Sequence, residues 1–221
     1  MEQFMEYFGF VTGLLYLIWE IRQNNLMWVV GILSALAYAF VFAQSALWAA
    51  MLFQVYYFCV SIYGLISWRR DKKLLASGSG NTAASSASSA STATAASAAA
   101  SPASPASPAI TYRIITPKAL LVSAAACAAV FAAIYWVLAR FTGDPMPVMD
   151  AVVATLGIVA TYWLGKAYLH QWLLWVGVNV LSVWMFFSQG LYLTAFLYIL
   201  YTLCAFYGFL HWKKNGVEIS V

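Results

Sequence analysis

The chain ends its third apolar segment with Tyr63-Gly64-Leu65-Ile66-Ser67-Trp68-Arg69-Arg70 and its last with Tyr207-Gly208-Phe209-Leu210-His211-Trp212-Lys213-Lys214. In both stretches a tyrosine–glycine pair and a tryptophan lead into two basic residues. From position 68 to position 212 the offset is 144. The same offset pairs Glu6 with Asp150, Gly13 with Gly157, Trp19 with Trp163, Arg22 with Lys166, Trp28 with Trp172, Leu47 with Leu191 and Tyr57 with Tyr201. Charges, glycines and tryptophans that match in register indicate an internal repeat.

Seven apolar segments are long enough to cross a bilayer, which takes about 20 helical residues. They cover about residues 4–20, 26–43, 47–67, 117–139, 149–165, 171–187 and 191–211. The chain is 64% hydrophobic and 8% charged, with a mean hydropathy of +0.80, whereas soluble domains carry about 25% charged residues. This composition excludes an ordinary soluble protein. The first six residues are acidic where a cleavable signal peptide would be basic, so we expect the first segment to be retained.

The fourth segment explains how the unit can repeat. Three spans bring the chain to the opposite side of the membrane, so one further span must intervene before the unit recurs in the same orientation. We therefore predict an all-α membrane protein of seven transmembrane helices in a 3+1+3 arrangement of parallel repeats. The repeats cover residues 1–70 and 149–214, and a connector helix covers 117–140. Such duplications place the substrate site at the repeat interface, near the membrane midplane.

The segment between the two halves has a different composition. Residues 76–109 are almost entirely alanine, serine and threonine and end in Ser-Pro-Ala repeats. Such a sequence cannot bury a core. We predict a disordered cytoplasmic tether over residues 71–116 and a short cytoplasmic tail over 215–221.

Loop charges predict the orientation. One side of the membrane carries a single basic residue, Arg140. The other side carries Arg22, Arg69, Arg70, Lys72, Lys73, Arg113, Lys118, Lys166, Lys213 and Lys214. Because cytoplasmic loops are enriched in lysine and arginine, we expect the N-terminus outside and the C-terminus in the cytoplasm.

The sixth segment carries a polar and aromatic face. Trp172, Trp175 and Asn179 stand at i, i+3 and i+7, so they share one side of a helix. Two indoles above an amide can hold a flat, polar or cationic ring by stacking, cation–π attraction and hydrogen bonding. The alternative is an interfacial tryptophan with an asparagine that bonds a neighbouring helix.

The third and seventh segments supply further candidates for the same site. These are Gln54, Tyr57, Tyr198, Tyr201 and Thr202. Gln54 is central in its span, where a lone amide needs a partner. Tyr57 and Tyr201 occupy matching positions in the two repeats, which fits symmetric core packing equally well.

Charged and catalytic groups are sparse. We expect Glu6, Glu20 and Asp150 near span ends, solvated by water and by basic neighbours such as Arg22. With no charge at mid-depth, uncoupled facilitated diffusion fits better than ion-driven pumping. The sequence offers no cofactor loop, metal-ligand spacing or activated nucleophile, so we do not expect an enzyme. The expected partners are a small-molecule substrate and membrane lipid rather than nucleic acid.

Three stretches resemble the PnuC family of bacterial vitamin transporters, whose best-known members carry nicotinamide riboside. They are residues 31–38, residues 54–68 and the Trp172-x-x-Trp175-x-x-x-Asn179 motif, which is the most specific. The resemblance covers both three-helix halves. It implies that this face, with Gln54, Tyr198, Tyr201 and Thr202, lines the substrate site. The tether is a departure from the family pattern.

The resemblance also implies a mechanism and a setting. The fold would be similar to SWEET-type carriers, and transport would be facilitated diffusion across the bacterial inner membrane. A cytoplasmic kinase would trap the vitamin by phosphorylation, and the protein would be a homotrimer. Thiamine and riboflavin remain alternative substrates, because each presents a flat heteroaromatic ring. A membrane-embedded interaction protein that transports nothing remains the alternative of another class.

Overall fold

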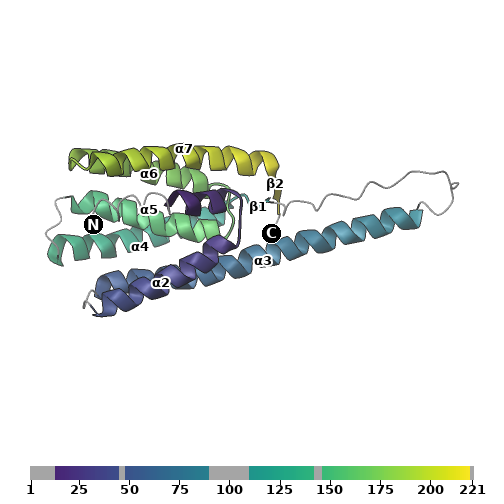
Figure 1. Ribbon diagram of the computed structural model, residues 1–221, viewed down its shortest axis with the longest axis horizontal. Coiled ribbons are helices and arrows are strands. Elements are labelled where there is room, and N and C mark those ends of the chain that lie inside the picture. Colours follow the sequence, from purple (N-terminus) through teal and green to yellow (C-terminus); the bar gives the residue numbers. More distant parts are fainter. Residues whose placement is uncertain (1–12, 45–47, 90–109, 142–145, 220–221) are drawn as a thin grey trace.

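The computed structural model describes residues 13–44, 48–89, 110–141 and 146–219. Residues 13–21 form a helix that precedes α2 (Leu26–Gln44) and α3 (Trp48–Ser89). They are followed by β1 (Ile110–Tyr112), α4 (Pro117–Phe141), α5 (Pro147–Gly165), α6 (Gln171–Ser188), α7 (Tyr192–Asn215) and β2 (Gly216–Glu218). Figure 1 shows α2 with α3 on one side of the bundle, α6 with α7 on the other, and α5 between them.

The described helices confirm an α-helical, multi-pass membrane protein. Five of them are long and apolar enough to span a membrane: residues 51–75 of α3, and α4, α5, α6 and α7. α2 contributes a shorter apolar stretch, Leu26–Ala37. Most of the first predicted span falls on residues 1–12, which lie outside the described part of the chain.

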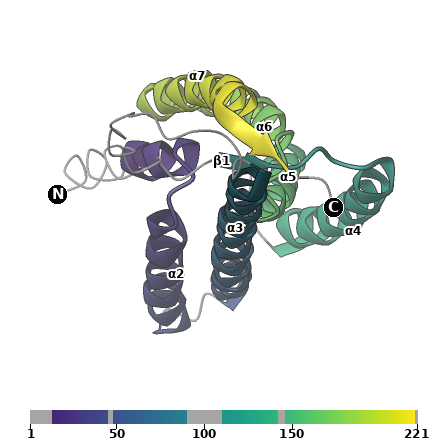
Figure 2. The ribbon, with the colours of Figure 1, turned by 90° about the vertical axis from the view of Figure 1, so that its right-hand side faces the viewer.

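Helix contacts join the two halves of the chain through their first helices. α2 packs along α3 and α6 along α7, while α5 contacts both α6 and α3. The helix of residues 13–21 lies between α2 and α7 (Figure 2), and a methyl group at Gly13 would overlap the Tyr201 hydroxyl of α7. On the other side, the Tyr56 hydroxyl of α3 donates to the Ile158 carbonyl of α5 at 2.6 Å.

Tryptophans and glycines pack alike at positions 144 residues apart. Trp28 of α2 lies so close to Gly64 of α3 that a Cβ there would be 2.5 Å from the indole Cε2. Trp172 of α6 lies over Gly208 of α7, where the corresponding Cβ would be 2.6 Å from Cζ3. The glycines therefore let each indole lie directly against the neighbouring helix backbone.

Four fully buried tryptophans form a continuous cluster near the β1 end of the bundle. Trp28 and Trp68 have ring centroids 5.1 Å apart, Trp68 and Trp212 are 6.1 Å apart, and Trp212 and Trp172 are 5.4 Å apart. All four side chains are 0% exposed. This tryptophan cluster takes two residues from each half, so it fills the space between the halves at that end.

Two indole N–H groups of the cluster bond across the halves. Trp68 Nε1 donates to the Leu164 carbonyl of α5 at 3.1 Å. Trp212 Nε1 donates to the Ile21 carbonyl of the first described helix at 2.9 Å. Both carbonyls lie in the last turn of a helix, where carbonyls commonly need partners from outside the helix. The Leu164 carbonyl also accepts the Ala167 backbone N–H at 2.9 Å.

The structure differs from the predicted tether at both ends. α3 continues without a break to Ser89, and residues 110–112 form a strand. Adding a residue to an already formed helix is easier than nucleating a new one, which favours this extension of α3. The remainder of the predicted tether, residues 90–109, lies outside the described residues.

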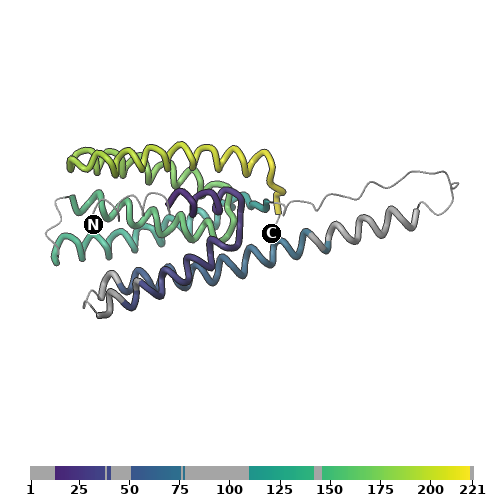
Figure 3. The backbone as a smooth tube through the Cα atoms, in the orientation of Figure 1, coloured from purple at the N-terminus to yellow at the C-terminus, as the bar shows by residue number. Residues whose placement is uncertain are grey.

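Residues 110–113 form a strap, named for its contacts with both halves. β1 pairs in parallel with β2, matching Ile110 to Gly216 and Tyr112 to Glu218. Figure 3 shows the two strands side by side at one end of the bundle. The predicted tail from residue 215 is therefore in part a strand.

On the first half, the strap bonds the turn after residue 21. Gln23 has a left-handed backbone, with φ of 49°. Its side chain donates from Nε2 to the Thr111 carbonyl at 2.8 Å and accepts from the Thr111 N–H at 2.7 Å. The matching residue of the second half, Ala167, is also left-handed, with φ of 56°.

Arg113 fastens the other end of the strap. Its guanidinium donates to both carboxylate oxygens of Asp71 on α3, at 2.7 and 2.6 Å. The same side chain donates to the Lys166 carbonyl at 2.9 Å, and its backbone N–H donates to the Ala167 carbonyl at 2.8 Å. The hydrogen bonds to the Asp71 carboxylate raise the pKa of Arg113. One residue thus ties α3 to the turn between α5 and α6.

Candidate functional site

Two adjoining cavities lie between the halves. The larger, of about 340 Å³, is lined by Tyr16, Glu20, Trp28, Gly31, Ser34, Ala35, Gln54, Tyr57, Ser61, Thr161, Leu164 and Trp175. The smaller, of about 250 Å³, is lined by Gly13, Tyr16, Leu17, Glu20, Trp172, Trp175, Asn179, Tyr198, Tyr201 and Ala205. Tyr16, Glu20 and Trp175 line both, so the cavities share one wall.

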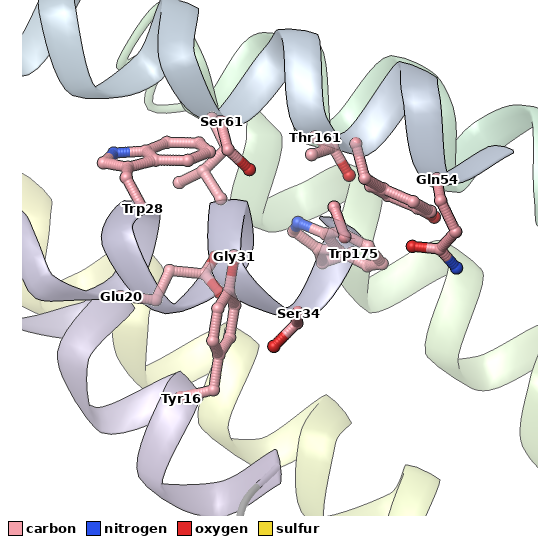
Figure 4. Close-up of a pocket in the computed structure, with 12 residues that line it drawn as sticks. Tyr16, Glu20, Trp28, Gly31, Ser34, Gln54, Ser61, Thr161 and Trp175 are labelled. Carbon is pink, nitrogen blue, oxygen red and sulfur yellow. The ribbon is translucent and has the colours of Figure 1, made fainter. Parts of the chain in front are cut away.

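The α6 face predicted from its spacing lines the smaller cavity. Trp172 is fully buried and Asn179 is 5% exposed. Trp175 reaches both cavities, and Figure 4 shows it between Gln54 on one side and Tyr16 and Glu20 on the other. Helical periodicity brings the three α6 side chains to one side, as the sequence predicts.

The candidates on α3 and α7 divide among three places. Gln54 and Tyr57 of α3 line the larger cavity, whereas Tyr198 and Tyr201 of α7 line the smaller one, with ring centroids 5.7 Å apart. Thr202 instead borders a separate apolar depression with Trp184 and Phe187; its hydroxyl donates to the Tyr198 carbonyl at 2.8 Å. The structure thus brings seven of the eight candidates to the two cavities and leaves Thr202 apart.

Tyr16 and Glu20 were not among the predicted site residues. Glu20 is only 5% exposed, which corrects the expectation that water and basic neighbours solvate it. Arg22, the neighbour expected to do so, is exposed. The repeat holds a signal that could have found both residues, because their partners 144 positions on are the apolar Ala160 and Leu164. A polar residue at a position whose repeat mate is apolar marks a break in symmetry.

Several polar atoms around the shared wall are buried without a hydrogen-bond partner in the described part of the chain. They are Glu20 Oε1, both polar side-chain atoms of Gln171, and the indole nitrogens of Trp172 and Trp175. Glu20 lies beside Gln171, yet these atoms do not meet hydrogen-bond geometry with each other. Buried polar groups in folded proteins are nearly always paired. These atoms therefore offer donors and acceptors to water or to a bound molecule.

The site contains one acidic side chain. Among the described residues that line either cavity, Glu20 is the charged one, and there is no lysine or arginine. Aromatic rings from three helices, Tyr16, Trp175 and Tyr198, supply flat apolar faces. Such a site can bind a flat ring with polar substituents.

Comparison with known proteins identifies the family of the chain. The family described as nicotinamide mononucleotide transporter matches residues 3–214 of the chain. Over 214 residues the chain is 28% identical to the nicotinamide riboside transporter PnuC of Escherichia coli (strain K12), which covers 97% of this chain and 87% of that protein. Over 211 residues it is 25% identical to the nicotinamide riboside transporter PnuC of Neisseria mucosa, covering 92% of this chain and 70% of that one.

A solved structure shares the fold. The crystal structure of the vitamin B3 transporter PnuC matches with a TM-score of 0.56 and 21% identity, covering 93% of this chain and 79% of the other. The family match over nearly the whole chain confirms the resemblance found in the sequence. The chain belongs to the nicotinamide mononucleotide transporter family, the PnuC family of vitamin transporters.

Proposed function

We propose that this protein carries nicotinamide riboside across the bacterial inner membrane by binding it in the two adjoining cavities. The observation that carries the proposal is the α6 face: Trp172, Trp175 and Asn179 line a cavity between the halves. The names of the E. coli and N. mucosa relatives supply the substrate. Thiamine and riboflavin are the alternatives within the same chemistry.

The charge of the cavities favours the riboside over the mononucleotide. A phosphate group is bound in proteins by arginine, lysine or the N-terminus of a helix. The described linings offer no arginine or lysine, and the Glu20 carboxylate would repel a phosphate. The riboside has no phosphate and its ring is cationic. It therefore needs no arginine or lysine and is not repelled by the Glu20 carboxylate.

Transport in this proposal is uncoupled and uses the two halves as moving parts. The halves form a 3+1+3 arrangement and rock about the cavities. Matching tryptophan–glycine packing and matching left-handed turns support the repeat. A cytoplasmic kinase keeps the transported riboside inside by phosphorylating it. The strap end is cytoplasmic and the N-terminus outside, in line with the basic residues near the strap. The homotrimer stays a proposal from the resemblance.

Calorimetric binding to the purified, detergent-solubilised protein tests the substrate. We expect nicotinamide riboside to bind, and Trp175→Ala to weaken it at least about ten-fold, equivalent to about 1.4 kcal/mol, because a ring face is lost. The matched control is Trp184→Ala on the same helix, which removes an indole that is 56% exposed and outside both cavities.

The other outcomes separate the alternatives. Selective binding of thiamine or riboflavin would keep the carrier and change the vitamin. Absence of binding by all three to folded protein would contradict a vitamin carrier and favour an interaction protein. Equal loss of affinity in Trp175→Ala and Trp184→Ala would contradict the placement of the site.

A further inference from the structure

The shared wall of the two cavities contains a carboxylate that the α6 motif does not explain. Glu20 is 5% exposed and lines both cavities, and its Oε1 has no partner among the described residues. In Figure 4 it lies beside Tyr16, which is one helical turn earlier on the same face. It therefore faces the space in which a ligand would bind.

The fold itself does not need an acid at this position. The repeat mate of Glu20 is Leu164, which is 2% exposed and packs in the apolar core. The two residues end equivalent helices, and each is followed by a turn with a left-handed residue. A leucine fills the equivalent position in the second half. Packing therefore does not require a glutamate in the first half, and its acidic group has another role.

Burying a carboxylate without a cation is unfavourable, and the described residues around Glu20 provide no cation. An ionised group removed from water needs a partner of opposite charge or several hydrogen bonds. The described cavity linings contain no lysine or arginine, and Arg22 is exposed. A ligand with a fixed positive charge would supply the missing partner.

The neighbours of Glu20 favour the same kind of ligand. Trp172 and Trp175 line the smaller cavity with it, and indole faces attract cations. Gln171, fully buried with both polar side-chain atoms unpartnered, lies beside Glu20 but is not among the described residues that line the cavities. The carboxylate and the indole faces therefore act together on one ligand of positive charge.

We infer that Glu20 is a specificity-determining residue, whose carboxylate faces a permanently cationic ring and makes the carrier select it over a neutral ring of the same shape. The inference rests on the proposed function and adds to it the basis of selection. It predicts that discrimination between the two charge states depends on one side chain.

The test compares two forms of one ligand on the full-length protein. Nicotinamide riboside has a cationic pyridinium ring, whereas its 1,4-dihydro form is neutral and keeps the ribose and the carboxamide. We expect the wild-type protein to bind the cationic form more tightly. Glu20→Gln should lose at least about ten-fold in affinity for the cation and stay within about two-fold for the neutral form. Glu20→Asp, which keeps the charge, should retain the preference.

Two variants guard against a folding artefact. Glu20→Leu copies the repeat mate Leu164, so it should fold and should show the same loss of selectivity as Glu20→Gln. The charge-matched control is Glu218→Gln, at an exposed position of β2, which should leave both affinities unchanged.

Three results would overturn the inference, and they differ from one another. Equal affinity of wild type and Glu20→Gln for the cation would leave the proposed function standing and remove the role of Glu20. An equal loss for both ligand forms would show that Glu20 contacts a shared group or only holds the structure. If wild-type protein binds neither form, the proposed function fails and the inference fails with it.

Discussion

At the scale of single residues, two glycines of α7 and α6 have opposite roles. Gly208 lies under the Trp172 indole, where an added Cβ would be 2.6 Å from the ring. Gly177 of α6 has open space at the same point, with nothing within 4 Å. The first glycine is needed for packing beside the site, whereas the second is not.

Gly208→Ala should therefore destabilise the protein by about 1–3 kcal/mol, since the indole must move or the helices must separate. Gly177→Ala should be neutral or stabilising by up to about 1 kcal/mol, because alanine favours the helix. Unfolding of the two variants in detergent checks this, with nicotinamide riboside binding as a second readout. Equal stability of both would contradict the close packing of Trp172.

The residues of the site could be predicted only where a local pattern identifies them. The spacing of Trp172, Trp175 and Asn179 is helical, and the structure places them on one cavity. Glu20 could not be placed in the same way. It lies close to the end of its predicted span, and that position predicts a carboxylate in contact with water. Its burial depends on α2, α6 and α7 coming together around it, which no local pattern records.

At the scale of elements, the strap depends on one buried ion pair. Arg113 and Asp71 are bonded through two charge-assisted contacts, and their side chains are 9% and 0% exposed. Removing one partner leaves the other charge buried and unpaired, which in proteins costs about 3–5 kcal/mol.

Arg113→Met should accordingly lower the free energy of unfolding by a few kcal/mol, about 3–5 by the same estimate. The double variant Arg113→Met/Asp71→Leu should recover part of it, because neither charge remains. Arg70→Met, next to Asp71 but exposed, is the control and should change little. Additive losses in the double variant would contradict direct pairing.

The strap itself could not be read from the sequence. Arg113 and Asp71 are 42 positions apart, with alanine- and serine-rich chain between them. The low-complexity composition of this segment predicts that it buries no core, and so it predicts a tether. It cannot report that the residues directly after it pair with β2 and with Gln23.

At the scale of the whole molecule, the two halves are joined without residues 77–108. Trp68 and Trp212 bond across the halves, α5 contacts α3, and the strap begins at Ile110. The apolar periodicity and the repeat were enough to predict helices and halves. How the halves contact each other required the structure.

Deleting residues 77–108 should leave uptake of labelled nicotinamide riboside by cells within about two-fold of wild type, because Asp71 and the strap are retained. A longer deletion, residues 77–113, removes the strap and should abolish uptake. If the shorter deletion abolishes uptake in protein that is inserted normally, the segment has a necessary role of its own.

The cross-half bond of Trp212 has a consequence for biosynthesis. The ribosome makes Ile21 191 residues before Trp212, yet the indole N–H of Trp212 donates to the Ile21 carbonyl. The Gln23 side chain likewise forms its hydrogen bonds to Thr111 only after Thr111 has been synthesised. The first half therefore acquires these two contacts with the strap and with α7 only after the later segments have been synthesised and inserted.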